Sequence, residues 1–221
     1  MPQGQSSQHQ STQQDAVTIV AVGGWLFKHR TLIPVPLALL ILLVPATGST
    51  TGLSWTFAGA GIVALGEALR LWGVHHIGAV SRTRTDRLGP LIASGPFAFV
   101  RNPLYIGNLA LWIGFAVSAG VSWLAPLIIV VLALEYHAIV RWEEGLLTTR
   151  LGDAYRAYAI SVPRWIPAFN RKGHEGHKQS DSSAVEPSAF SGRDTFFSER
   201  GTLIGIAVGF LLIWIKLKTQ N

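Results

Sequence analysis

Two short segments of the chain hold residue types that could bind a charged ligand. The first consists of Gly95-Pro96-Phe97 followed by Arg101-Asn102-Pro103-Leu104-Tyr105-Ile106-Gly107. Pro103 suits the first turn of a helix, where the N–H that it lacks would have no intrahelical partner. The residues around it would then lie near a helix N-terminus, whose backbone donors favour an anionic group, and Gly107 would let a ligand or another backbone approach closely. By itself, this segment is more typical of a loop before a membrane helix than of a binding site.

The second segment begins with two adjacent carboxylates, Glu143 and Glu144, and continues through Tyr155 and Tyr158 to Arg164, which lies between two prolines. Acids at a membrane surface can simply be solvated. A ligand that carries a cation would give them a reason to face inward. Each of these residues is ambiguous when it is considered alone.

Taken together, the two segments resemble the superfamily of isoprenylcysteine carboxyl methyltransferases and phospholipid methyltransferases, which are integral membrane enzymes. The similarity lies in the order and spacing of a Gly-Pro-aromatic turn, the Arg-to-Gly helix start, the Glu-Glu pair, the two tyrosines and the ending Val162-Pro163-Arg164-Trp165-Ile166-Pro167. It covers residues 53–167, and the full set is far more specific than either segment. The usual histidine of the family is Asn102 here. Because asparagine cannot transfer a proton near neutral pH, we expect no acid or base at this position.

The resemblance implies a methyltransferase that uses S-adenosylmethionine in a cytosolic pocket above a helix bundle. It implies that the acids contact the amino group and ribose of the cofactor and that the arginine-bearing loops lie near its carboxylate. Arg164 and Glu144 are expected to be catalytic. The residues expected to bind the cofactor are Arg101, Asn102, Tyr105, Gly107, Glu143, Glu144, Tyr155 and Tyr158. No metal site is predicted, because two adjacent histidines, such as His75 and His76, point in different directions on a helix.

The methyl acceptor is expected to be amphipathic or lipid-like. A prenylcysteine carboxylate, a phospholipid amine and a small thiol all remain open. Methyl transfer from a sulfonium requires a nucleophile in line with the S–CH₃ bond, so positioning and the exclusion of water can supply much of the rate. A pocket in a membrane protein would supply both, with the acceptor entering from the lipid side and the cofactor from the cytosol.

Transmembrane helices are the elements that must position these residues. Hydrophobic residues make up 49% of the chain and charged residues only 14%, well below the roughly 25% of an average soluble domain. The apolar residues are gathered into runs that approach the length of a membrane span. We predict an all-α, polytopic transmembrane bundle of four to five spans, at residues 31–47, 53–74 and 104–140, the last forming a hairpin with a tight turn near Ser118-Ala119-Gly120. The run at 202–215 either crosses the membrane or lies on its surface.

Charges complete the topological prediction. The net charge is +6, and the basic residues flank the apolar runs, which indicates topology signals and anionic lipids and not a nucleic-acid partner. The amino terminus and both motif loops are therefore expected in the cytosol. Glu67 and Arg70 interrupt the second span at i,i+3 spacing, so they can pair, either near the headgroups or as part of the site. The lack of cysteine excludes disulfides, thiolate metal sites and cysteine nucleophiles.

The predicted organisation has five parts. Residues 1–15, rich in Gln and Ser, form a disordered tail that lacks the features of a cleavable signal peptide. Residues 16–30 form an interfacial or pre-span segment, residues 31–170 the membrane methyltransferase core, residues 171–200 a polar linker, and residues 201–221 a C-terminal apolar helix. We expect this last helix to be an appendage to the core.

Two alternatives belong to other classes of protein. An NADPH-dependent sterol or steroid reductase would resemble the same C-terminal region, but those enzymes tend to carry an acid where this chain has Asn108 and a Val-Pro-Tyr ending where it has Val-Pro-Arg. A membrane scaffold that keeps the fold without the activity is the second alternative, and Asn102 is the argument for it. Titration with S-adenosylmethionine and NADPH would discriminate among the three.

Overall fold

The computed structural model describes residues 21–47, 52–78, 91–167 and 191–220, and these residues are mainly helical. A helical segment at residues 21–29 is followed by eight further helical elements, two of them short 3₁₀ turns: α2 (Val35–Leu43), α3 (Leu53–Ile77), η3 (Gly95–Ala98), α4 (Pro103–Ser118), η4 (Ser122–Leu124), α5 (Ala125–Leu151), α6 (Asp153–Ser161) and α7 (Gly192–Gln220). No strand occurs in these ranges. The prediction of an all-α fold is confirmed.

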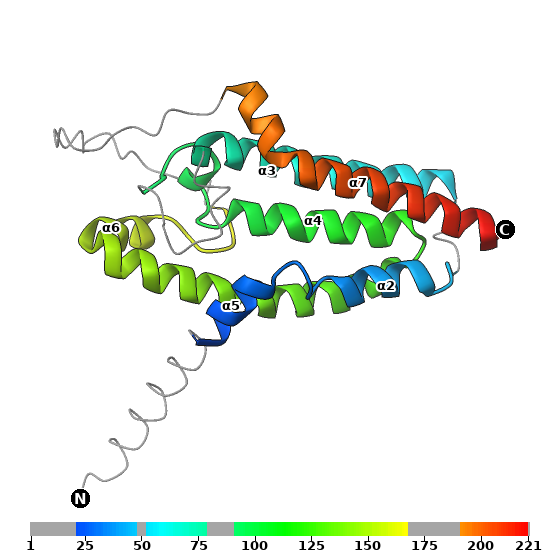
Figure 1. The fold of residues 1–221 in the computed structure, drawn as a ribbon, viewed down its shortest axis with the longest axis horizontal. Coiled ribbons are helices and arrows are strands. Elements are labelled where there is room, and N and C mark those ends of the chain that lie inside the picture. The colour runs from blue at the N-terminus through cyan, green and yellow to red at the C-terminus, as the bar shows by residue number, and fades with distance from the viewer. Residues whose placement is uncertain (1–20, 48–51, 79–90, 168–190, 221) are drawn as a thin grey trace, which may run out of the picture.

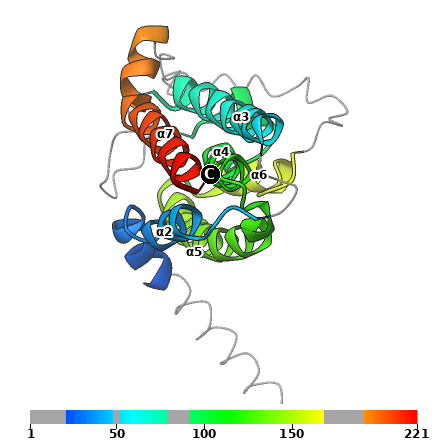
Figure 2. The same cartoon turned by 90° about the vertical axis from the view of Figure 1, so that its right-hand side faces the viewer.

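Five of these helices form a bundle. α2, α3, α4, α5 and α7 lie side by side along the long axis of the molecule (Figure 1). Seen from the end, α4 lies in the middle, with α3, α7, α2 and α5 around it (Figure 2). Every residue of α4 is accordingly buried or half-buried, although this apolar helix has only 16 residues. The helix that begins with the first motif is therefore the centre of the bundle.

Small residues allow α3 and α4 to pack closely. A Cβ atom added to Gly107 would lie 2.6 Å from Cγ of Arg70 and 2.8 Å from the carbonyl oxygen of Gly66. A Cβ added to Gly66 would in turn lie 2.8 Å from the carbonyl oxygen of Gly107. At the other end of this contact, the Ser118 hydroxyl donates to the carbonyl of Thr56 at 3.2 Å. Such pairs of small residues are typical of helix contacts in membranes.

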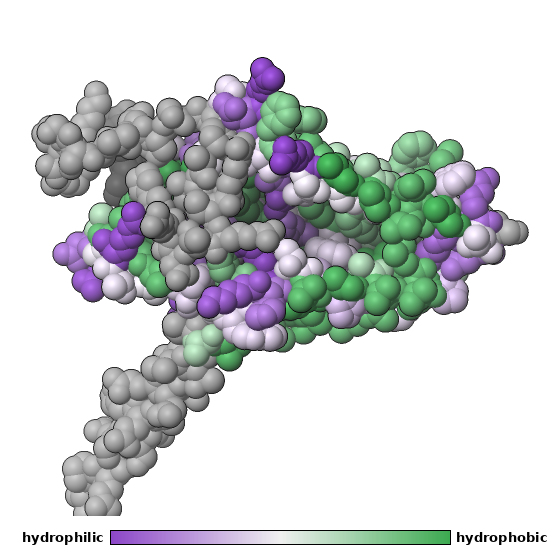
Figure 3. Space-filling model, in the orientation of Figure 1, coloured by the Kyte–Doolittle hydropathy of each residue, from purple (hydrophilic) through white to green (hydrophobic). Residues whose placement is uncertain are grey.

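Three helical stretches are long and apolar enough to cross a membrane: Leu53–Ile77, Ser122–Leu151 and Gly192–Gln220. Their outward-facing side chains contribute to a largely hydrophobic surface over the middle and right of the bundle in Figure 3. The predicted hairpin is also confirmed, since α4 ends at Ser118 and Gly120 turns the chain with φ +71°. In the first predicted span, by contrast, α2 covers only Val35–Leu43. The protein is integral to the membrane, and the count of four to five crossings stays a prediction.

The C-terminal helix differs most from expectation. α7 begins at Gly192, so its first residues lie in the stretch that the sequence analysis assigned to the polar linker. It also packs against α2, α3 and α4. Near its end, buried Lys216 donates to the carbonyls of Ile41 at 2.7 Å and Ala119 at 3.1 Å, which lie at the C-terminal ends of α2 and α4. Helix ends leave such carbonyls without intrahelical partners, so this lysine stabilises two helix ends at once. The division into core and appendage stays a prediction, while residues 1–15 lie outside the described residues.

Candidate active site

A cavity of about 850 Å³ opens where α3 and α5 end and α4 begins. From there it extends between α2 and α7 along α4, so one end is polar and the other is apolar. The hollow between α2 and α7 is seen in Figure 3, with hydrophilic residues inside it and hydrophobic rims. This cavity brings the two motif segments together.

Glu144 lies between two arginines at the polar end. Its Oε1 accepts from Nη1 of Arg101 at 2.7 Å and from Nε of Arg164 at 3.0 Å, while its Oε2 accepts from Nη2 of Arg164 at 2.5 Å. The side chains of Arg101 and Glu144 are each only 14% exposed. The hydrogen bonds that Arg164 donates to Glu144 raise the pKa of the Arg164 guanidinium. Such bidentate, charge-assisted contacts are among the strongest that side chains make.

Backbone and amide contacts hold the same segments together. The backbone N–H of Arg101 donates to the carbonyl of Pro163 at 2.9 Å, and Nδ2 of Asn102 donates to the carbonyl of Arg164 at 3.1 Å. Asn102 thus orients the backbone that carries Arg164. An amide group can make this hydrogen bond at any physiological pH, because it does not ionise.

This arrangement bears on one expectation about charge, which stays a prediction. The sequence analysis placed acids and arginines around different groups of the cofactor, whereas Glu144, Arg101 and Arg164 form one cluster. Their charges are already paired before any ligand binds. The cluster has one more cation than anion. Both carboxylate oxygens of Glu144 already accept hydrogen bonds from arginines, whereas the sequence analysis expected this carboxylate to bind the cofactor.

Glu143 is arranged differently. The Tyr105 hydroxyl donates toward its carboxylate, with both oxygens at 3.2 Å, and the ring of Tyr105 packs on that of Tyr136 with centroids 4.8 Å apart. Among the described residues, no cation lies within ion-pair distance of Glu143. Tyr105 is therefore the side chain that orients this buried carboxylate.

The tyrosines of α6 connect this helix to the first motif. Tyr158 donates to the carbonyl of Phe97 at 2.8 Å, which fixes the Gly-Pro-Phe turn. Gly95 in this turn has φ +58°, and a Cβ there would lie 2.6 Å from the ring of His76, so the position favours glycine. Tyr155 is buried, and burial, reinforced by Glu144, raises the pKa of its hydroxyl. Tyr155 consequently remains a neutral hydrogen-bond donor at physiological pH.

The predicted site residues fall into two groups. Most of them line the cavity: Arg101, Asn102, Tyr105, Glu143, Glu144, Tyr155 and Tyr158. Arg164 lies behind Glu144, next to a smaller hollow. Gly107 lies at the contact between α3 and α4 and not in the lining, because its missing side chain makes room for Arg70.

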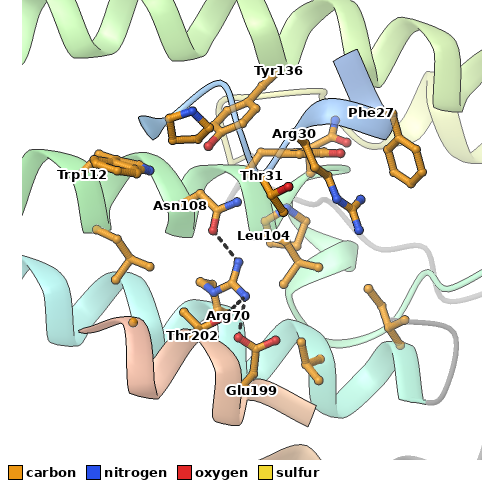
Figure 4. Close-up of a pocket in the computed structure, with 18 of the residues that line it drawn as sticks. Phe27, Arg30, Thr31, Arg70, Leu104, Asn108, Trp112, Tyr136, Glu199 and Thr202 are labelled. Carbon is orange, nitrogen blue, oxygen red and sulfur yellow. Dashed lines mark hydrogen bonds and ion pairs between the residues drawn. The ribbon is translucent and has the colours of Figure 1, made fainter. Parts of the chain in front are cut away.

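A second polar cluster, which we call the Arg70 cluster, also borders the cavity (Figure 4). Arg70 donates to Asn108 on α4, and through Nη2 to Glu199 at 2.5 Å and Thr202 at 3.1 Å on α7. Its Nε lies 3.4 Å from Glu67, so the predicted Glu67–Arg70 pair is confirmed. The sequence analysis missed Glu199 and Asn108. Two features of the sequence could have indicated them. Arg70 lies in an apolar helix, where a buried arginine requires several hydrogen-bond acceptors, and Glu199 lies directly before an apolar run.

Comparison with known proteins shows which families the chain is similar to. The family model for phospholipid methyltransferases matches residues 55–154, which include the first motif and the Glu-Glu pair but end before Tyr155. The nickel-cobalt-cadmium resistance protein NccN of Alcaligenes xylosoxydans xylosoxydans is 26% identical over 152 residues, which are 66% of this chain and 68% of that protein. The cobalt-zinc-cadmium resistance protein CzcN of Cupriavidus metallidurans is 27% identical over 108 residues, or 49% of this chain and 47% of that protein.

A yeast enzyme is also similar. Phosphatidyl-N-methylethanolamine N-methyltransferase of Saccharomyces cerevisiae is 30% identical over 105 residues, which are 45% of this chain and 50% of that protein. The chain thus spans about half the length of two of these three relatives. No solved structure matches it. Through the matched residues, the chain is similar to the membrane methyltransferases that its motifs resemble.

Proposed function

We propose that this protein transfers the methyl group of S-adenosylmethionine to an amphipathic or lipid-like acceptor at the cytosolic face of the membrane. The observation that carries the proposal is the shape of the cavity, which joins a polar end at Glu143 and Glu144 to an apolar part between α2 and α7. A polar cofactor and a lipophilic acceptor can meet only in a space that has both kinds of wall.

The residues at the polar end fit the cofactor. S-adenosylmethionine would supply a methyl group on a cationic sulfonium, next to an ammonium and a carboxylate. Glu143 offers an acid that makes no ion pair among the described residues, and Tyr105 orients its carboxylate. The Glu144 cluster fixes the surrounding segments in place, and the buried Tyr155 supplies a neutral donor beside it. Preorganised groups of this kind can hold two reactants in line, which is what methyl transfer requires.

The apolar part fits an acyl or prenyl chain. It is lined by Ala38 and Leu42 of α2 and by Gly205, Gly209 and Leu212 of α7. Gly205 leaves room for a chain to lie against the backbone of α7, because a Cβ there would meet nothing within 4 Å, whereas Gly209 packs on the ring of Phe115. The yeast relative is named for a phospholipid amine, and this favours the amine among the three acceptor types. In that case the nitrogen lone pair forms the new N–CH₃ bond, the S–CH₃ bond breaks, and the nitrogen loses a proton to solvent.

Ligand titration tests the proposal. Full-length protein in detergent would be titrated with S-adenosylmethionine, S-adenosylhomocysteine and NADPH by calorimetry. We expect binding of the first two and none of NADPH. Binding of NADPH alone would favour the reductase alternative, and binding of none of them would favour a scaffold. Radioactive methyl transfer into a lipid extract would then identify the acceptor.

A further inference from the structure

The positive charges near the cavity differ in how well they are neutralised. Arg101 and Arg164 share Glu144, and Arg70 is paired with Glu67 and Glu199. Arg30 also lines the cavity, yet within the described residues it has no ion pair. An arginine has five N–H donors and is always charged, so one that lacks a counter-ion in a partly buried position can bind an anion strongly.

Arg30 is held in place by contacts with α5. The segment at residues 21–29 packs so closely on α5 that a Cβ added to Gly23 would lie 2.8 Å from Cβ of Trp142. The ring of Phe27 packs on that of Trp142 with centroids 4.8 Å apart, and Cζ of Arg30 lies 4.2 Å from the Phe27 centroid. This cation–π contact orients the guanidinium, whose N–H donors have no hydrogen-bond partner among the described residues. In Figure 4, Arg30 and Arg70 reach into the same space from opposite sides.

Glu143 is the acid that matches Arg30. It follows Trp142 directly, lines the same cavity, and likewise has no ion pair among the described residues. The cavity therefore presents one cation and one anion whose charges attract each other but which make no ion pair among the described residues. A ligand with a cationic and an anionic group close together is complementary to such a pair.

We propose that Arg30 is the anion-binding residue of this site and that it takes a carboxylate or phosphate group of a ligand whose cationic group lies at Glu143. The inference rests on the proposed function. Two ligands offer this chemistry: the amino-acid end of S-adenosylmethionine has a carboxylate, and a phospholipid headgroup has a phosphate. The inference differs from the sequence-based prediction, which assigned the anion to Arg101 and Arg164, because both of these are bound to Glu144.

The test compares ligands that differ by one anionic group. Full-length wild type and Arg30→Ala would be titrated in detergent with S-adenosylmethionine and with its decarboxylated form. The same proteins would be titrated with short-chain phosphatidylethanolamine and with the diacylglycerol of matched chain length. Lys28→Ala removes an exposed cation from the same segment and serves as the matched control. Arg30→Gln and Arg30→Lys keep most of the side-chain volume, in case the alanine variant does not fold.

The expected result is a loss of about 10- to 100-fold in affinity for the anionic member of one ligand pair, the range for losing a charge-assisted hydrogen bond. If wild type but not Arg30→Ala prefers S-adenosylmethionine to its decarboxylated form, the anion is the cofactor carboxylate. If only the preference for the phospholipid is lost, the anion is the lipid phosphate. Arg30→Lys should retain part of the preference, and Lys28→Ala all of it.

Unchanged preferences in both Arg30→Ala and Arg30→Gln would overturn the inference while leaving the proposed function intact. Failure of the wild type itself to bind S-adenosylmethionine would be a different result. It would refute the proposed function and, with it, the inference that depends on it.

Discussion

Two clusters of ion pairs border one cavity, and they differ in their ratio of arginines to acids. The Glu144 cluster has two arginines for one acid, whereas the Arg70 cluster has two acids, Glu67 and Glu199, for one arginine. The first joins segments that surround the polar end, and the second joins α3 to α7 farther along the cavity. Each cluster satisfies most of its charge internally, so the groups left for a ligand are those outside both clusters. A charged residue that lines a pocket is therefore not a ligand-binding residue by that fact alone, because other side chains can already pair with its charge.

The largest effect is expected from Glu144→Gln. It leaves two arginines without their shared acid, and breaking a buried charged contact typically costs about 2 to 5 kcal/mol. We expect cofactor affinity to fall at least about 30-fold, because the segments around the polar end lose their common anchor. Calorimetry with S-adenosylmethionine in detergent measures the loss.

The control for this variant is Asp153→Asn. Asp153 pairs with Arg156 at 2.9 Å, but its side chain is 95% exposed, so the pair should contribute little. Equal affinity in Glu144→Gln and the wild type would show that the cluster does not support cofactor binding.

A smaller effect is expected from Glu199→Gln. Arg70 keeps Glu67, Asn108 and Thr202 as partners, so the loss of one charge should cost about 1 to 3 kcal/mol of stability. Cofactor affinity should change much less than in Glu144→Gln. A double-mutant cycle with Arg70→Met and Glu199→Gln, measured by thermal unfolding in detergent, gives the coupling energy. Additive effects of the two substitutions would contradict the pairing across α3 and α7.

Tyr105→Phe should have a still smaller effect. It removes the hydroxyl that donates to Glu143 and keeps the packing of the ring on Tyr136. The loss of one such bond is worth about 0.5 to 1.5 kcal/mol, so we expect roughly a 2- to 10-fold weaker affinity for S-adenosylmethionine. Tyr158→Phe is the useful comparison, because its hydroxyl binds a backbone carbonyl and not an acid. A larger loss in Tyr158→Phe than in Tyr105→Phe would argue against a direct role for Glu143.

The smallest expected effect concerns pH. Because burial raises the pKa of Tyr155 in the folded state, its contribution to stability is complete below the ordinary tyrosine value of 10.0 and is lost as the pH rises above it. Between pH 7 and pH 9, wild type and Tyr155→Phe should therefore show parallel stability curves. Above pH 10 the wild type alone should lose the contribution that Tyr155 makes to the free energy of unfolding. Thermal unfolding across the pH series tests the sign. If the two curves stay parallel above pH 10 as well, the tyrosine ionises as readily in the folded protein as in the unfolded chain.

Local signals in the sequence predicted much of the fold and most of the cavity lining. The Pro103 helix start, the turn at Gly120 and the i,i+3 pair of Glu67 with Arg70 each depend on residues close in the chain. Glu199 and Arg30 could not be assigned in this way, because their roles depend on contacts with distant helices. Gly107 shows the converse, since glycine suits both a ligand and a packed helix, and only the position of α3 decides between them.

The contacts of α7 also bear on how the protein is made. This helix is the last described part of the chain to leave the ribosome, and it supplies one wall of the cavity together with Glu199. Until it arrives, Arg70 has Glu67 as its only acid, and the side of α4 that carries Asn108 lacks its cover. A nascent chain that already holds both motif segments would thus still expose polar groups to lipid. A chain truncated before α7 is therefore expected to be less stable in the membrane than the chain that includes it.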